Sequence, residues 1–280
     1  AYNTTINLES DLVNPNTTDK FNVARVYGGG FQGVVTGNTA LYLGGGKVSE
    51  AIAGAANADI YGYTEMFVGK DLAGNYDDNY KFTAALEEGK GGNVYGGNDF
   101  GGMIWGTGQH TVAADGNMPE KKVTSNTYVE YITGLVENSV FGGACGSYNY
   151  VLTNVYKYAQ PSPSSVLTYK TDATTGMVTA PTGYTMPTIL ASAGTITNSA
   201  INANTFVNVK SQITEQTDAL VSGAFYGGGK GYLDLSGIVD VEQTYVLLHA
   251  ASGRSMVLSP EVYGGGYYSL VKNTMVDAYT

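Results

Sequence analysis

Apolar and polar residues alternate with a period of two in two short phrases that recur along the whole chain. The first phrase is an apolar residue, an aromatic ring and then glycines, with clear copies beginning near residues 26, 94, 140, 225 and 262. The second is a Thr, usually after Asn, followed by alternating apolar residues, with copies beginning near residues 4, 39, 64, 127, 205, 244 and 274. A period of two is the period of a β-strand, and no helical period of useful length occurs in these phrases. The pattern therefore predicts short strands.

The two phrases alternate along the chain. Residues 39–54 align without a gap on residues 127–142, and this alignment places Ile52-Ala53-Gly54 over Val140-Phe141-Gly142 as a worn copy of the glycine phrase. With that copy included, six glycine phrases and seven threonine phrases never exchange order. Self-similarity at a period of 20 to 50 residues indicates a repeat architecture.

The shortest repeat runs from Tyr27 to Ala53, about 26 residues. A unit of this length, with short strands and glycine corners, predicts one coil of a parallel β-helix, each coil lying about 4.8 Å further along the axis. The blade of a β-propeller usually needs about 40 residues or more. We therefore expect an all-β chain that forms one domain over residues 1–280, a single-stranded β-helix of six to seven coils. This domain is expected to be a fragment or module of a larger repeat protein.

Alternation assigns the two positions of each glycine phrase to opposite faces. The apolar residue is expected in one continuous core, and the following ring is expected to face outward. The inward positions are Val26, Val94, Val140, Phe225 and Val262, and the outward rings are Tyr27, Tyr95, Phe141, Tyr226 and Tyr263. The rings form a candidate binding face for sugars, or they stack on each other and stabilise the fold. The stabilising interpretation is favoured because Ala53 takes the ring's place in one repeat.

The phrase Val-Tyr-Gly-Gly-Gly followed by Asn-Thr resembles the repeats of large secreted surface proteins of gut Bacteroidales that are described as adhesins. The resemblance rests on residues 26–30, 38–43, 94–97, 126–136, 226–229 and 262–266, and it spans nearly the whole chain. Residues 141–144 are also similar, more weakly, to the repeats of chlamydial polymorphic outer-membrane proteins. The resemblance implies a right-handed parallel β-helix, secreted or exposed at the cell surface, and it implies no catalytic residues.

Composition narrows the classes of partner. The chain has 280 residues, a formal net charge of −10 and only 14 Lys and Arg, which argues against nucleic acid as a partner. No apolar run approaches the roughly 20 residues of a membrane helix. The remaining partners are a surface glycan, a protein ligand, or further repeats of this or another chain that stack on its ends.

Candidate chemical groups are few. Cys145 is expected to be a small buried side chain, and neither His110 nor His249 shares a motif with it that would make it a nucleophile. Asp71, Asp77 and Asp78 form a weak candidate Ca²⁺ site through oxygen ligands, although a solvated acidic loop is the favoured interpretation. No catalytic residue is predicted, but a polysaccharide lyase or glycoside hydrolase on the same fold is the alternative to an adhesive module.

Insertions interrupt the repeat at several places. The longest is 157–203, and others are expected at about 9–25, 70–92, 107–125, 210–222 and 249–261. In repeat proteins such insertions form loops and commonly carry binding.

Overall fold

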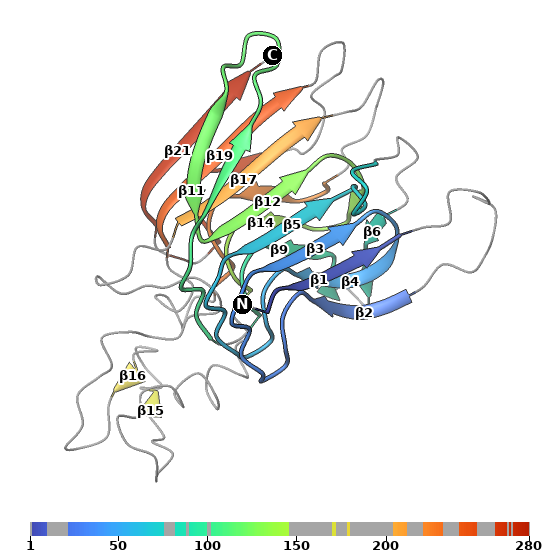
Figure 1. The fold of residues 1–280 in the computed structure, drawn as a ribbon, viewed down its shortest axis with the longest axis vertical. Helices are drawn as coiled ribbons and strands as arrows, with labels where there is room; N and C mark the ends of the chain where they lie inside the picture. Colours follow the sequence, from blue (N-terminus) through green and yellow to red (C-terminus); the bar gives the residue numbers. More distant parts are fainter. Residues whose placement is uncertain are drawn as a thin grey trace.

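The computed structural model shows an all-β protein whose sheets are mostly parallel, with no helix among the described residues (Figure 1). The structure describes residues 2–9, 22–75, 82–87, 90–99, 102–145, 170–171, 178–179, 204–211, 221–231, 241–250, 261–267, 269 and 271–279. Of the predicted insertion 157–203, only the short strands β15 (Lys170–Thr171) and β16 (Val178–Thr179) lie within this part.

The threonine phrases form one parallel sheet. Its order is β1-β3-β5-β12-β17-β19-β21, and each strand pairs in parallel with its neighbours. The strands are β1 (Thr4–Leu8), β3 (Thr39–Leu43), β5 (Thr64–Val68), β12 (Thr127–Tyr131), β17 (Asn204–Ser211), β19 (Val241–Ala250) and β21 (Val271–Tyr279). Their registers align all seven threonines as predicted.

The glycine phrases form a second parallel sheet, and the chain passes repeatedly from one sheet to the other. Its order is β13-β6-β4-β9-β14-β18-β20, with β2 also paired to β4. The strands are β2 (Asn22–Tyr27), β4 (Gly46–Ile52), β6 (Phe82–Ala84), β9 (Asn93–Tyr95), β13 (Leu135–Val136), β14 (Val140–Phe141), β18 (Ala224–Tyr226) and β20 (Glu261–Tyr263).

Two antiparallel hairpins interrupt this pattern early in the chain. One is β7 (Leu86–Glu87) with β8 (Lys90–Gly91), and the other is β10 (Gly108–Val112) with β11 (Lys121–Ser125). The second falls in the predicted insertion 107–125. Its strand β11 lies over the outer face of the seven-stranded sheet (Figure 1).

A hydrogen bond joins six of the seven threonine phrases to a glycine phrase. The hydroxyl of Thr127 donates to the carbonyl oxygen of Gly142 at 2.6 Å, and Thr205 donates to Gly227 in the same way. Both threonine side chains are buried, so the bond satisfies two polar groups that water cannot reach. The same bond recurs from Thr4, Thr39, Thr64 and Thr244.

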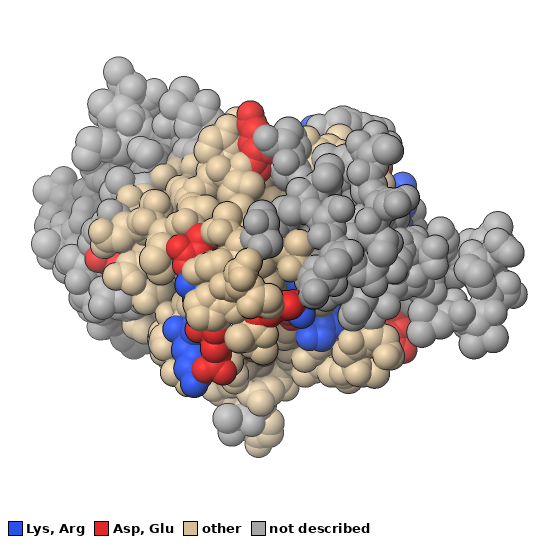
Figure 2. Space-filling model, turned by 90° about the horizontal axis from the view of Figure 1, so that it is seen from above, with Lys and Arg blue, Asp and Glu red and all other residues tan. Residues whose placement is uncertain are grey.

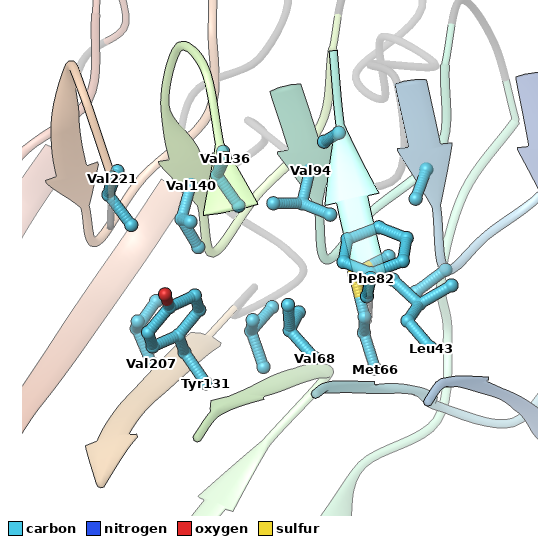
Figure 3. Close-up of a cluster of buried hydrophobic side chains, with 14 of the residues drawn as sticks. Leu43, Met66, Val68, Phe82, Val94, Tyr131, Val136, Val140, Val207 and Val221 are labelled. Atoms are coloured by element: carbon cyan, nitrogen blue, oxygen red, sulfur yellow. The ribbon is translucent and has the colours of Figure 1, made fainter. Parts of the chain in front are cut away.

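The core lies between the two sheets. Val94 and Val140 of the eight-stranded sheet point toward Met66, Val68 and Val207 of the seven-stranded sheet (Figure 3). Four of the five predicted inward residues, Val26, Val94, Val140 and Phe225, belong to this buried cluster. The fifth, Val262, is 37% exposed, because β20 is an edge strand among the described residues.

One alignment prediction is wrong by a single residue. The strand registers pair Val26 with Ala51 and Tyr27 with Ile52, and Ile52 in turn pairs with Tyr95. Ile52, and not Ala53, therefore fills the ring's place, and Ala53 stands where the other repeats have their first glycine. The bond from Thr39 to the Ala53 carbonyl oxygen confirms this register.

Candidate functional site

The predicted aromatic ladder exists, but most of it is buried. The rings stack along the outer side of the eight-stranded sheet, with centroids 5.1 Å apart for Tyr95 and Phe141, 4.8 Å for Phe141 and Tyr226, and 5.0 Å for Tyr226 and Tyr263. Tyr95 and Phe141 form a buried cluster with Ile52 and Cys145. Such offset stacks stabilise a fold by about 0.5–1.5 kcal/mol per pair beyond the area that they bury.

Burial limits what the ladder can bind. Tyr95 and Phe141 are 0% and 2% exposed, whereas Tyr263 is 43% exposed. Tyr27 and Tyr226, which pack against the cluster, are half-buried. The expectation that all five rings present one flat surface is therefore wrong for its centre, and a continuous sugar-binding face on this ladder would need buried rings.

A charge cluster that the sequence did not predict lies beside the first rings of the ladder. The guanidinium of Arg25 pairs with Glu50 at 2.7 Å and with Asp99 at 3.0 Å, and the hydroxyl of Tyr27 donates to Asp99 at 2.7 Å. The carboxylates of Glu50 and Asp99 are 8% and 0% exposed, while the side chain of Arg25 is 45% exposed. Arg25 therefore covers both acids.

Burial dominates the protonation of this cluster. It raises the pKa of Asp99 and of Glu50 above their usual values, even though Arg25 acts in the opposite direction. It also raises the pKa of Tyr27, and the Asp99 charge raises that pKa further. Raised carboxyl pKa values are typical of catalytic acids. Here, however, the same acids bind a guanidinium from the neighbouring strand.

The one-residue error in the sequence alignment hid the pairing of Arg25 with Glu50. Arg25 is in register with Glu50, and Glu50 is in register with Asn93, so Glu50 occupies the polar position that precedes the inward residue. Aligning Ala51-Ile52 with Val94-Tyr95 would have found this pair. Asp99 lies 74 residues from Arg25, and no sequence signal joins them.

Cys145 is buried, as expected. Burial raises the pKa of its thiol well above the usual value, and the charge of Asp99 adds to this effect. A neutral, inaccessible thiol is a poor nucleophile.

Both histidines of the chain are buried on the side of the seven-stranded sheet that carries the β10–β11 hairpin. His110 of β10 stacks on Tyr128 with centroids 4.3 Å apart, and its Nδ1 lies 3.3 Å from a Glu65 oxygen. On β19, Nε2 of His249 lies 2.9 Å from Oδ1 of Asn208, whose Nδ2 donates to the Tyr128 hydroxyl. Because Asn208 presents its oxygen to His249, the imidazole donates from Nε2.

His249 should make the protein less stable in mild acid. Burial, with a smaller contribution from Lys210, lowers the pKa of His249 to about 4. Between the unfolded pKa of about 6.5 and this value, unfolding takes up a proton, so stability falls as pH falls, by at most about 3 kcal/mol. We expect the melting temperature to drop between pH 6.5 and 4, and to drop less in His249→Gln. An equal drop in both proteins would contradict the assignment of this acid sensitivity to His249.

The acidic loop is described only in part. Both carboxylate oxygens of Asp71 accept hydrogen bonds from Asn75, one from its backbone N–H and one from its amide. Asp77 and Asp78 lie outside the described residues, so the Ca²⁺ prediction stays a prediction. Among the residues that are described, no group of three acidic, His or Cys side chains gathers as metal ligands would.

The charged side chains do not form a large patch of one sign on the face shown in Figure 2. Most of its described surface is uncharged, and Lys and Arg lie next to Asp and Glu. In the part of the chain that the structure describes, no helix is long and apolar enough to cross a membrane.

A concave surface lies between strand β11 and the starts of β17, β19 and β21. This groove has a volume of about 390 Å³. Its floor holds Asn204, Gln243 and Asn273, one from each strand, with Tyr245 and Met275 beside them. The hairpin falls in the predicted insertion 107–125, but the sequence predicts no groove there.

Comparisons with family models, with curated proteins and with solved structures find no match to this chain. The assignment of function therefore rests on the residues and their geometry.

Proposed function

We propose that the chain is a right-handed parallel β-helix that serves as a structural and adhesive module of a secreted or cell-surface protein. The alternation of the chain between two parallel sheets supports the β-helix, as does the common register of the threonines and of the glycine phrases. Each repeat then contributes one strand to each sheet, and the proposal comprises six to seven coils.

The functional proposal rests on the contacts that residues at the same position of successive repeats make with one another. The threonine hydroxyls bind glycine carbonyl oxygens, and the rings of the ladder stack on each other. These repeated contacts stabilise a rigid scaffold, because each strand is held mainly by its two neighbours. The residues that bind a partner would then lie on the surface and in the insertions, as in a module that displays binding surfaces.

The proposed partner is a surface glycan or a protein ligand, and stacking on further repeats or on another chain is part of the same proposal. The net charge of −10 supports a partner other than nucleic acid, since a polyanion would be repelled.

A polysaccharide-active enzyme is the second candidate, and the Arg25 cluster is the observation that favours it. Two carboxylates with raised pKa values beside an arginine resemble an acid–base pair. Their burial and their pairing with Arg25 favour a structural role instead, because a substrate would first have to displace the guanidinium.

Two measurements separate these functions. We expect the full chain to bind glycans on an array and to release no reducing ends from plant or mucin polysaccharides. Release of reducing ends at enzymatic rates, lost in both Asp99→Asn and Glu50→Gln, would overturn the adhesive proposal.

A further inference from the structure

The groove beside β11 differs from the rest of the molecule in the state of its amide side chains. At the position before the threonine, Asn38 accepts the backbone N–H of Tyr63, and Asn126 accepts that of Asn204. This series stops at Asn204, whose Oδ1 is buried and has no hydrogen-bond partner among the described residues. The groove therefore begins at β17, where the amide oxygen before the threonine no longer accepts a backbone N–H from the next strand.

Three amides then stand in a row. The registers pair Asn204 with Gln243 and Gln243 with Asn273, so these residues lie on neighbouring strands about 4.8 Å apart. Gln243 and Asn273 are exposed. An amide both donates and accepts hydrogen bonds, which suits a ligand whose hydroxyl groups do the same.

The groove also has a firm apolar side. The ring of Tyr245 stacks on Phe206 with centroids 5.2 Å apart, and its hydroxyl donates to Asp277, which Lys121 of β11 also binds at 2.8 Å. These contacts hold the ring in place. Beside it, Met275 is 53% exposed, and its flexible thioether adapts to an uneven apolar surface such as the C–H face of a sugar ring.

Charge and size restrict the ligand. Among the described residues that line the groove, Lys122 is the charged one, and its ammonium pairs with Glu120 at 2.7 Å. A carboxylate or phosphate group of a ligand would therefore compete with Glu120 for the ammonium of Lys122. The volume of about 390 Å³ is near the lower end of the 300–1,000 Å³ typical of ligand sites.

We propose that this groove binds a short stretch of a neutral carbohydrate chain, with Gln243 and Asn273 as the main hydrogen-bonding residues. The inference rests on the proposed adhesive function and assigns it to one surface. The aromatic ladder of the eight-stranded sheet is not part of this site.

The test is calorimetric titration of the full chain with neutral hexasaccharides of glucose, xylose, mannose and galactose, and with hexagalacturonate as the acidic probe. We expect at least one neutral probe to bind more tightly than hexagalacturonate. The double variant Gln243→Ala, Asn273→Ala should bind that probe at least about tenfold more weakly, because both changes remove hydrogen bonds. Thr124→Trp, which places a large ring in the groove, should abolish binding.

Gln109→Ala is the matched control, since Gln109 is an exposed amide on β10 that does not line the groove. Circular dichroism and melting curves confirm that each variant is folded. Neutral probes that bind the double variant as tightly as the parent would overturn the groove while leaving the adhesive function intact. Preference for the acidic probe, or no binding of any probe, would also overturn the groove. Attachment to a mucin that survives removal of its glycans would instead assign the adhesive function to a protein ligand.

Discussion

Gly142→Ala is expected to destabilise the protein by at least about 3 kcal/mol, because two backbones meet where the new methyl group would lie. A Cβ at Gly142 would be 2.3 Å from the carbonyl oxygen of Gly227 and 2.7 Å from a Val207 methyl. Neither neighbour can move freely, since Gly227 accepts the Thr205 hydroxyl and Val207 is buried in the core. The measurement is chemical denaturation of parent and variant.

Gly33→Ala is the control for this prediction, because a Cβ at Gly33 would have no atom within 4 Å. It should change stability by less than about 0.5 kcal/mol. Equal effects of the two substitutions would show that the close approach of the strands at Gly142 is absent in solution.

Val140→Asp is expected to have the other large effect, more than about 4 kcal/mol, because it buries a carboxylate without a partner. Val140 is fully buried between Val94 and Phe225 of the neighbouring strands. The damage should extend to both of these strands and expose them to proteolysis, and limited proteolysis with mass spectrometry would locate the cuts. Gln109→Asp, at an exposed position, is the control and should leave the digestion pattern unchanged.

Tyr95→Ala separates a stabilising ladder from an exposed binding face. Because Tyr95 is fully buried and stacked on Phe141, the change should lower stability by about 3–5 kcal/mol. Thermal unfolding of Tyr95→Ala and Tyr263→Ala compares a buried ring with an exposed one. A smaller loss for Tyr95 than for Tyr263 would contradict the burial of the ladder.

The sequence by itself determined the short strands of the two phrases, the alternation of these phrases along the chain and most of their registers. The period of two and the recurring Asn-Thr pair can be read from a few consecutive residues. In a parallel sheet, strands that carry the same pair align at it, so these signals also predict the register. The core residues Val94 and Val140 followed from this periodicity. The register failed only at Ala51-Ile52, where no ring marks the phrase and the apolar run Ala51-Ile52-Ala53 allows a slip of one residue.

Only the tertiary structure decided which outward surfaces become buried and which side chains meet there. Periodicity places Tyr95 and Phe141 on the face away from the core, but it does not show that this face is itself covered. The meeting of Arg25 with Asp99, and the groove beside β11, depend on where turns and a hairpin return to the sheets. Those paths are set by packing between distant segments, and a short sequence pattern carries no record of them.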